Sequence, residues 1–231
     1  IEEMAHIASN GEPVEVVQSE EESTAALVFK TIVDPYVGKL SLFRVYSGDV
    51  NADSTLFNPN RNVQEKIGKV FMLSGKKQLE AKRIKAGDIG AVAKLDKTKT
   101  GDTLCDMGKD IILTGIEFPD PVLSMAVAPK EKGDEEKIIS GLTKLMDEDP
   151  TFTVTNNVET KQTLINGLGE QHIDVLISKL NSKYAVNVIL SEPIVPYRET
   201  IMGKAKVEGK HKKQSGGHGQ YGHVFIEFEP C

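Results

Sequence analysis

Glycines 217, 219 and 222 fit the G-x-G-x-x-G spacing that holds the pyrophosphate of a dinucleotide. In such a site the glycines follow a strand and open a helix, and an acidic residue follows about 20 positions later. Here a lysine-rich stretch precedes the glycines and an alternating, strand-like stretch follows them. The sequence therefore excludes a dinucleotide site. The simplest interpretation is a glycine-rich turn between two strands.

The neighbours of these glycines suggest a different chemistry. Five lysines stand against one acidic residue, Glu208, and lead directly into the glycines: Lys204, Lys206, Lys210, Lys212 and Lys213. Positive charge, small residues, amide donors and the ring of Tyr221 would meet at one tip. Contacts to phosphates, 2′-hydroxyls or splayed bases require those groups. The alternative is a solvated lysine face, the usual meaning of a charge run alone.

The sequence predicts no catalytic residue and no metal site. His211, His218 and His223 are spaced by 7 and 5 residues without a cysteine pair, which is no usual zinc arrangement, so we interpret them as polar loop residues. His172 lies at the rim of an apolar helix face and is expected to be a packed or interface residue. None of the nucleophile, metalloprotease or phosphate-loop motifs occurs.

Composition bounds the class of protein. The chain has 231 residues, 39% hydrophobic and 27% charged, which is ordinary globular composition with room for two or more domains. No apolar run approaches the roughly 18 residues of a membrane span, and the two cysteines fit a reducing compartment. These features predict a cytoplasmic protein without a membrane partner. The chain starts without Met and stops after an alternating stretch, which suggests a piece of a longer protein.

Charge divides the chain into four segments. Residues 1–24 carry seven acids and no Lys or Arg, and residues 25–112 carry 15 basic and 10 acidic residues. Residues 113–193 carry 7 basic and 13 acidic residues, and residues 194–231 carry 6 and 4. Two basic segments thus lie within an acidic chain of net charge −6. The acidic net charge therefore does not exclude a nucleic-acid partner.

Strand-like runs follow an acidic segment that we expect to be a solvated lead-in, residues 1–24. These runs cover 25–33, 39–46, 54–57, 66–73 and 89–95 and are separated by Gly, Pro and Asp turns. Short, evenly spaced strands predict a small closed β-barrel over residues 25–112.

Residues 113–193 follow a different pattern. A strand at 122–128 precedes a helix that Asp134 can cap, with Ile138, Ile139, Leu142, Leu145 and Met146 on one face. A hairpin across Asn156-Asn157, a second helix and a strand at 185–190 follow. The order β-α-β-β-α-β predicts a ferredoxin-like sandwich. Residues 194–231 form a third, basic unit that ends as a strand.

Eight peptides in one order resemble the translational GTPase elongation factor G. They are 29–40, 43–48, Ala86-Gly-Asp-Ile89, Thr100-Gly-Asp-Thr-Leu-Cys105, Glu148-Asp-Pro-Thr-Phe152, Gly167-Leu-Gly-Glu-Gln-His-Ile-Asp174, Tyr197-Arg-Glu-Thr200 and 214–222. The resemblance implies that 25–112 are the domain II barrel, 113–193 the ferredoxin-like domain III and 194–231 the truncated start of an α+β domain IV. Residues 1–24 would then be the tail of a missing GTP-binding domain.

The family couples GTP hydrolysis to movement of transfer and messenger RNA through the ribosome. By resemblance, GTP and Mg²⁺ belong to the missing domain, and this piece has no cofactor and no enzymatic activity of its own. Expected partners are ribosomal RNA, the tRNA–mRNA pair at the decoding region and the parent's GTP-binding domain, with His172 at an interdomain contact. Domain III would relay the state of the nucleotide switch as a rigid-body shift.

The glycine loop resembles the domain IV tip that reaches the decoding region. The implied RNA-binding residues are Lys210, Lys212, Lys213, Gln214, Ser215, Gly216, Gly217, His218, Gly219 and Gln220. Two departures from the family pattern, His218 in place of Arg and Gln171 in place of Leu, point to a divergent paralogue. The alternatives are a ribosomal protection-type GTPase, a GTP-independent ribosome- or RNA-binding module and, remotely, a metabolic enzyme.

Overall fold

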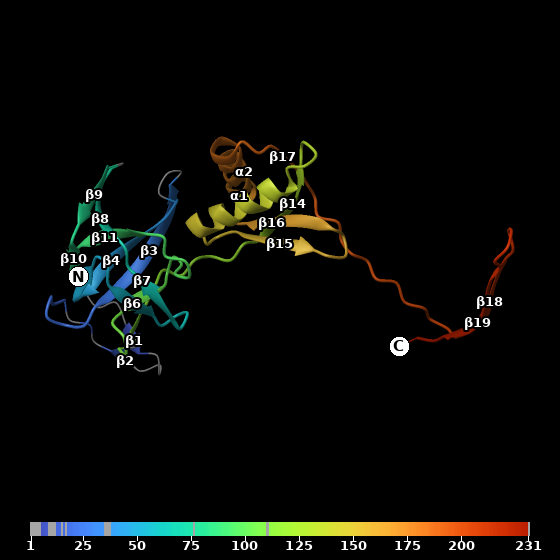
Figure 1. Ribbon diagram of the computed structural model, residues 1–231, viewed down its shortest axis with the longest axis horizontal. Coiled ribbons are helices and arrows are strands. Elements are labelled where there is room, and N and C mark those ends of the chain that lie inside the picture. The colour runs from blue at the N-terminus through green and yellow to red at the C-terminus, as the bar shows by residue number, and fades with distance from the viewer. Residues whose placement is uncertain are drawn as a thin grey trace. The chain divides into compact units, whose positions relative to one another are not determined.

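A computed structural model describes residues 6–8, 13–14, 16, 18–34, 38–75, 77–109 and 111–230 (Figure 1). The chain divides into two compact units, Ile1–Pro193 and Ile194–Cys231. The first unit holds a β-rich module followed by an α+β module, and the second holds one hairpin. No helix within the described residues is long and apolar enough to cross a membrane.

The β-rich module is an eight-stranded antiparallel sheet with the order β7-β6-β12-β3-β4-β11-β8-β9. Its strands are β3 (Ala25–Asp34), β4 (Gly38–Ser47), β6 (Thr55–Asn58), β7 (Val63–Lys66), β8 (Val70–Ser74), β9 (Lys77–Ala81), β11 (Ile89–Ala93) and β12 (Thr103–Cys105). A separate two-stranded sheet pairs β5 (Asp49–Asn51) with β10 (Arg83–Lys85). Among the described residues no ladder joins β7 to β9, so hydrogen bonds do not close this curled sheet into the expected barrel.

The core of this module follows from the two-residue period of its strands. Side chains on β4 alternate in burial, and Phe43 and Val45 are fully buried. They pack with Val28, Ile67 and other residues of one apolar cluster. The expected strand at 66–73 is instead the end of β7 and the start of β8, separated at the loop that contains Gly68.

The segment before β3 contains two paired strands, whereas the sequence predicts a solvated lead-in. Strands β1 (His6–Ala8) and β2 (Pro13–Val14) form a small sheet with β13 (Ile111–Leu113). Leu113 packs with Ala25 and Leu27, which lie on the face of β3 opposite Val28. Both faces of β3 are therefore buried. Of the predicted lead-in, residues 1–5, 9–12, 15 and 17 lie outside the described part of the chain.

Residues 18–24 form a strap that is bonded to the module along its length. The amide of Gly48 donates to the Ser19 carbonyl at 2.8 Å, and the Thr24 amide donates to Asp106 Oδ2 at 2.8 Å. Gly48 has φ +65°, and an added Cβ would lie 2.7 Å from the Thr24 backbone. Only glycine allows so close an approach in this left-handed conformation.

The Thr100-Gly-Asp turn is fixed by a buried polar network. Asp102 accepts hydrogen bonds from the Arg61 guanidinium at 2.8 Å and from Asn58 Nδ2 at 3.1 Å. Glu65 accepts from the Thr98 amide at 2.7 Å and from its hydroxyl at 2.9 Å. These partners satisfy the buried carboxylates, which would otherwise destabilise the fold.

The α+β module has the order β-α-β-β-α-β that the sequence predicts, and its sheet order is β15-β16-β14-β17. Its elements are β14 (Leu123–Pro129), α1 (Glu135–Glu148), β15 (Thr153–Asn157), β16 (Gln162–Gly167), α2 (Glu170–Tyr184) and β17 (Val188–Ser191). Leu142 and Leu145 of α1 and Leu176 and Leu180 of α2 are buried in the core that the helices form with the sheet. The ferredoxin-like sandwich is thus confirmed.

Three local predictions in this module are wrong. Asp134 stands at the start of α1, but its carboxylate binds Lys137 Nζ at 2.7 Å and caps no amide. Ile139 is 43% exposed because it lies at the margin of the apolar stripe. Asn156 and Asn157 belong to β15, and the turn follows them, with Asn157 Oδ1 accepting the amides of Glu159 and Thr160.

A buried carboxylate joins the two modules of the first unit. Glu148, the last residue of α1, is 8% exposed. It accepts a hydrogen bond from the Val33 amide of β3 at 2.8 Å and from Lys183 Nζ of α2 at 2.7 Å. Lys30 Nζ donates to the Glu148 carbonyl at 3.3 Å. One side chain therefore binds a strand of the β-rich module and both helices of the sandwich together.

We expect Glu148→Ala to destabilise the first unit by about 3 kcal/mol, because it leaves a partly buried amide and a partly buried ammonium without their acceptor. Hydrogen exchange at the Val33 amide should accelerate together with the loss of stability in urea. Glu136→Ala, an exposed carboxylate on the same helix, is the matched control. Equal effects of the two substitutions would contradict the prediction.

Candidate nucleic-acid interface

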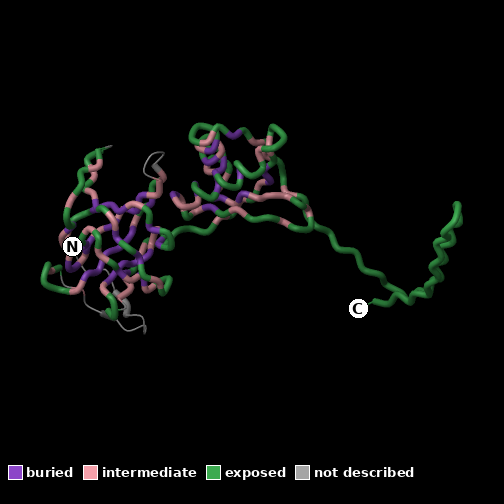
Figure 2. Tube along the Cα trace, in the orientation of Figure 1, coloured by how far each residue is buried: buried purple, intermediate pink, exposed green. Residues whose placement is uncertain are grey.

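The second unit contains one antiparallel hairpin of β18 (Ala205–Lys213) and β19 (Gln220–Phe228). The register is continuous from Ala205 opposite Phe228 to Lys213 opposite Gln220. Every residue of both strands is exposed, and Figure 2 shows this exposure along the whole hairpin. A regular ladder thus ends in a loop of residues 214–219.

The loop needs two of its glycines for backbone geometry. Gly216 and Gly217 have φ of +64° and +78°, a region that side chains disfavour. The His218 amide donates to the Gly216 carbonyl at 3.1 Å, which tightens the bend. Nothing lies within 4 Å of a Cβ built at either glycine, so these positions are required for conformation and not for close packing.

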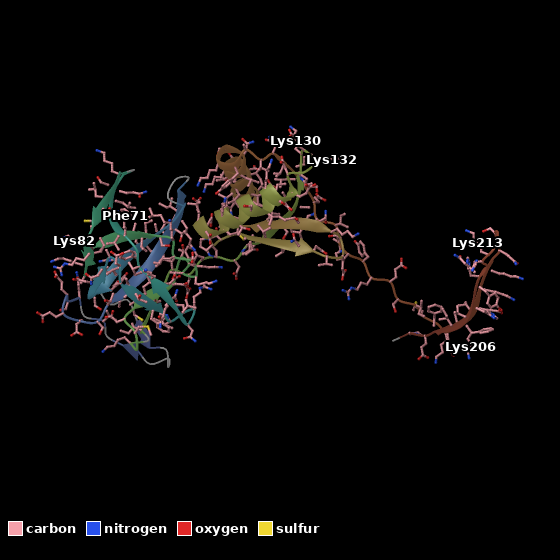
Figure 3. All side chains as sticks on the ribbon, viewed as in Figure 1. Phe71, Lys82, Lys130, Lys132, Lys206 and Lys213 are labelled. Carbon is pink, nitrogen blue, oxygen red and sulfur yellow. The ribbon has the colours of Figure 1, made fainter. Side chains whose placement is uncertain are left out.

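The hairpin brings all but one of the predicted site residues to its loop end. Lys210, Lys212 and Lys213 are in the part of β18 nearest the loop, and Gln220 is the first residue of β19. The loop holds Gln214, Ser215, Gly216, Gly217, His218 and Gly219. Figure 3 shows Lys213 near the loop and Lys206 near the open end of the hairpin. Their role in RNA binding stays a prediction.

Lysines along the hairpin differ in their partners. Lys204 Nζ lies 2.5 Å from Glu229 Oε2, and Lys206 Nζ lies 3.2 Å from Glu227 Oε2. Within the described residues, no carboxylate is recorded within 4 Å of Lys210, Lys212 or Lys213. The lysines near the open end of the hairpin are therefore neutralised by glutamates, whereas those near the loop keep their positive charge.

Two of the three histidines assigned to loops lie in strands instead. His211 belongs to β18 and lies 3.4 Å from Gln220 Oε1 through Nε2. His223 belongs to β19, and its Nε2 lies 2.6 Å from Glu208 Oε1. The strand predicted from the alternating stretch that begins at His223 is confirmed, whereas the interpretation of His223 as a loop residue is wrong. No group of three or more potential metal ligands occurs in the part of the chain that the structure describes.

His172 lies in the first unit and takes part in a fixed network. The Leu168 amide donates to Nδ1 at 3.1 Å, so Nδ1 is an acceptor and Nε2 carries the proton. Nε2 lies 3.1 Å from Asp149 Oδ2, to which it donates. The ring meets Phe152 edge-on with 6.2 Å between centroids. These contacts agree with a packed histidine, and the interdomain contact stays a prediction.

Asp149 is the anionic end of this network. Partial burial raises the pKa of its carboxyl, but hydrogen bonds from the Thr151 hydroxyl and amide and from His172 outweigh burial and hold the pKa below its ordinary value. Thr151 Oγ1 lies 2.5 Å and its amide 3.0 Å from Oδ1. The carboxylate therefore ties the end of α1 to the start of α2.

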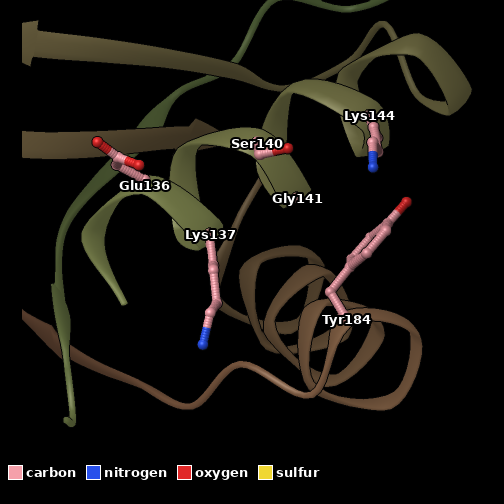
Figure 4. Close-up of a pocket in the computed structure, with 6 residues that line it drawn as sticks. All are labelled: Glu136, Lys137, Ser140, Gly141, Lys144 and Tyr184. Carbon is pink, nitrogen blue, oxygen red and sulfur yellow. The ribbon is translucent and has the colours of Figure 1, made fainter. Parts of the chain in front are cut away.

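A solvent-open groove of about 370 Å³ runs between α1 and the end of α2 (Figure 4). Its lining residues are Glu136, Lys137, Ser140, Gly141, Lys144 and Tyr184. Lys144 Nζ lies 5.4 Å from the centre of the Tyr184 ring, and burial and the Glu148 charge raise the pKa of Tyr184. Sequence reasoning missed this groove because its residues come from two separate helices.

Comparison with known proteins accounts for the order of the modules. The family model described as Elongation factor G domain 2 matches residues 23–107, that of Elongation Factor G, domain III matches 118–192, and that of Elongation factor G, domain IV matches 193–231. A crystal structure of a protein from Thermus thermophilus is similar, with TM-score 0.72 and 35% identity. The chain belongs to the elongation factor G family.

The chain spans about a third of the length of this Thermus thermophilus protein. The similarity to the Thermus thermophilus protein includes 89% of this chain and 31% of that one. The curled sheet is domain II, the sandwich is domain III and the hairpin belongs to domain IV. The matched models are those of domains II, III and IV, and the family assignment is that of a translation factor.

The network around Asp149 predicts a pH dependence of stability in this chain. Because folding lowers the pKa of Asp149, its contribution is complete above the ordinary value near 3.8 and is lost as pH falls through the lower pKa of the folded state. Asp149→Asn should therefore lower the free energy of unfolding at pH 6, and the difference from the unmodified chain should shrink below about pH 4.

Urea unfolding between pH 6 and pH 2 measures this difference. Asp174→Asn, which removes an exposed carboxylate of α2, is the control and should behave like the unmodified chain throughout. A difference for Asp149→Asn that is independent of pH would contradict the assignment.

Proposed function

We propose that this chain supplies the ribosome contact and the interdomain relay of an elongation factor G-type GTPase that moves the tRNA–mRNA pair. The observation that carries the proposal is the placement of the domain IV match on a hairpin whose loop end is positively charged. GTP and Mg²⁺ would be held by a GTP-binding domain of the parent protein. Divergence at His218 and Gln171 is compatible with a paralogue that uses the same architecture.

Physical chemistry supports RNA as the target of the loop. Lysines without carboxylate partners release counterions when they neutralise phosphates, and this release drives sequence-independent binding. Gly216 and Gly217 carry no side chain, so the backbone amides of the loop can approach a phosphate or a 2′-hydroxyl. The loop would then position the hairpin on RNA without reading a sequence.

The relay function rests on the contact between the modules of the first unit. Glu148 bonds to β3 and to α2 at once, so a displacement of the sandwich is opposed by a buried charge-assisted contact. Such a contact favours rigid-body motion of packed elements over independent bending. We propose that domains II and III transmit a switch signal through this contact.

Co-sedimentation with 70S ribosomes tests the proposal. Replacing Lys210, Lys212 and Lys213 together by Ala should weaken binding and lower the salt dependence by about one phosphate contact per lysine. In the full-length parent, the same change should slow translocation. Lys204→Ala with Lys206→Ala, which removes ion-paired lysines of the same unit, is the control. Absence of ribosome binding by the unmodified chain would overturn the proposal.

The proposal that GTP is held by another domain of the parent protein leads to a second prediction. This chain should show no saturable binding in a titration with fluorescent GTP and Mg²⁺, because the nucleotide site is assigned to another domain. Tight GTP binding by the chain alone would contradict that assignment.

A further inference from the structure

The two faces of the β18–β19 hairpin carry different residues. Side chains alternate between faces along each strand, so the register assigns every residue to one of them. One face is apolar toward the open end, with Ala205, Val207, Val224, Ile226 and Phe228, and continues toward the loop with Gly209, His211, Lys213, Gln220 and Gly222. The other, which we term the ring face, carries Lys206, Glu208, Lys210 and Lys212 of β18 and Tyr221, His223, Phe225 and Glu227 of β19.

Three rings form a continuous ladder on the ring face. The centroids of Tyr221 and His223 are 6.5 Å apart, and those of His223 and Phe225 are 4.8 Å apart. Tyr221 is 65% exposed and Phe225 is 75% exposed. Rings held side by side in this way, next to lysines on the same face, have the arrangement of a stacking platform.

Contacts on the ring face hold the middle ring in place. His223 Nε2 lies 2.6 Å from Glu208 Oε1, across the strand pair, and Lys206 pairs with Glu227 at 3.2 Å. The acids of this face are thereby occupied. Lys210 stands opposite His223 and Lys212 opposite Tyr221, and within the described residues neither has a recorded carboxylate partner.

We propose that the ring face binds single-stranded RNA, with bases stacked on Tyr221 and Phe225 and phosphates bound by Lys210 and Lys212. Aromatic platforms beside a positive track bind single strands in this way, and stacking tolerates any base. In an A-form duplex the bases are already stacked, so rings on a flat strand face do not reach them. The inference deepens the proposed function and rests on it, because it adds an unpaired RNA segment to the loop contact.

Fluorescence anisotropy of the complete 231-residue chain tests the ring face. The probe is a fluorescein-labelled, unstructured RNA of about ten nucleotides, within the site sizes of single-strand binders, and a duplex of the same length serves for comparison. We expect the single strand to bind more tightly than the duplex. Phe225→Ala and Tyr221→Ala should each weaken single-strand binding by about tenfold.

Conservative variants separate stacking from structure. Phe225→Leu keeps an apolar side chain without a ring and should weaken binding as Phe225→Ala does, whereas Phe225→Tyr should bind like the unmodified chain. Tyr197→Ala, an 89% exposed tyrosine of the same unit outside the hairpin, is the matched control. Circular dichroism of each variant shows that the fold is kept.

The outcomes distinguish this inference from the proposed function. Ring variants that bind within twofold of the Tyr197→Ala control, or a duplex bound as tightly as the single strand, overturn the ring face. An acidic peptide that displaces the RNA equally well from the unmodified chain and from Phe225→Ala also overturns it, since charge alone would then explain binding. If ring variants keep full affinity but the lysine variant loses ribosome binding, the loop proposal stands without the ring face.

Discussion

The first unit depends on the burial of one carboxylate at a helix end. Glu148 closes α1, and its side chain and its carbonyl are bound by groups from β3 and α2. Removing a carboxylate from water is costly, and strong hydrogen bonds to charged and backbone donors must compensate. The same requirement explains the second buried centre, where Asp102 and Glu65 organise the loop between β11 and β12. In the first unit, hydrogen bonds to buried carboxylates thus fix how the apolar parts of the fold pack against one another.

The second unit differs from the first in the contacts that hold it together. The residues of its hairpin are exposed in this chain, and a complete ladder of backbone pairs and ion pairs near the open end hold the two strands together. Lysines near the open end have carboxylate partners and those near the loop have none within the described residues, and three adjacent rings, Tyr221, His223 and Phe225, share one face. This combination concentrates attraction for a polyanion at the loop and apolar area just behind it.

Much of this architecture could be predicted from the sequence. The two-residue alternation in 39–46 and the helical spacing of Ile173, Leu176 and Leu180 indicate their elements directly, because burial imposes those periods. Short strands such as β5, β10 and β12 escape detection because three residues are too few to show a period. The burial of Glu148 could not be predicted, because its partners are 35 and 115 residues away in the chain. The alternation in β19 predicted a strand, but only the register with β18 shows which side chains share a face.

The strap of residues 18–24 gives the β-rich module a mechanical property. Ser19 near its start is bonded to Gly48, Thr24 at its end is bonded to Asp49 and Asp106, and Lys85 Nζ lies 2.9 Å from Glu20 Oε1. A force transmitted through the strap therefore acts on these contacts before it reaches β3. The load is shared between the Gly48 turn, Lys85 and Asp106 instead of falling on the first residue of β3 alone.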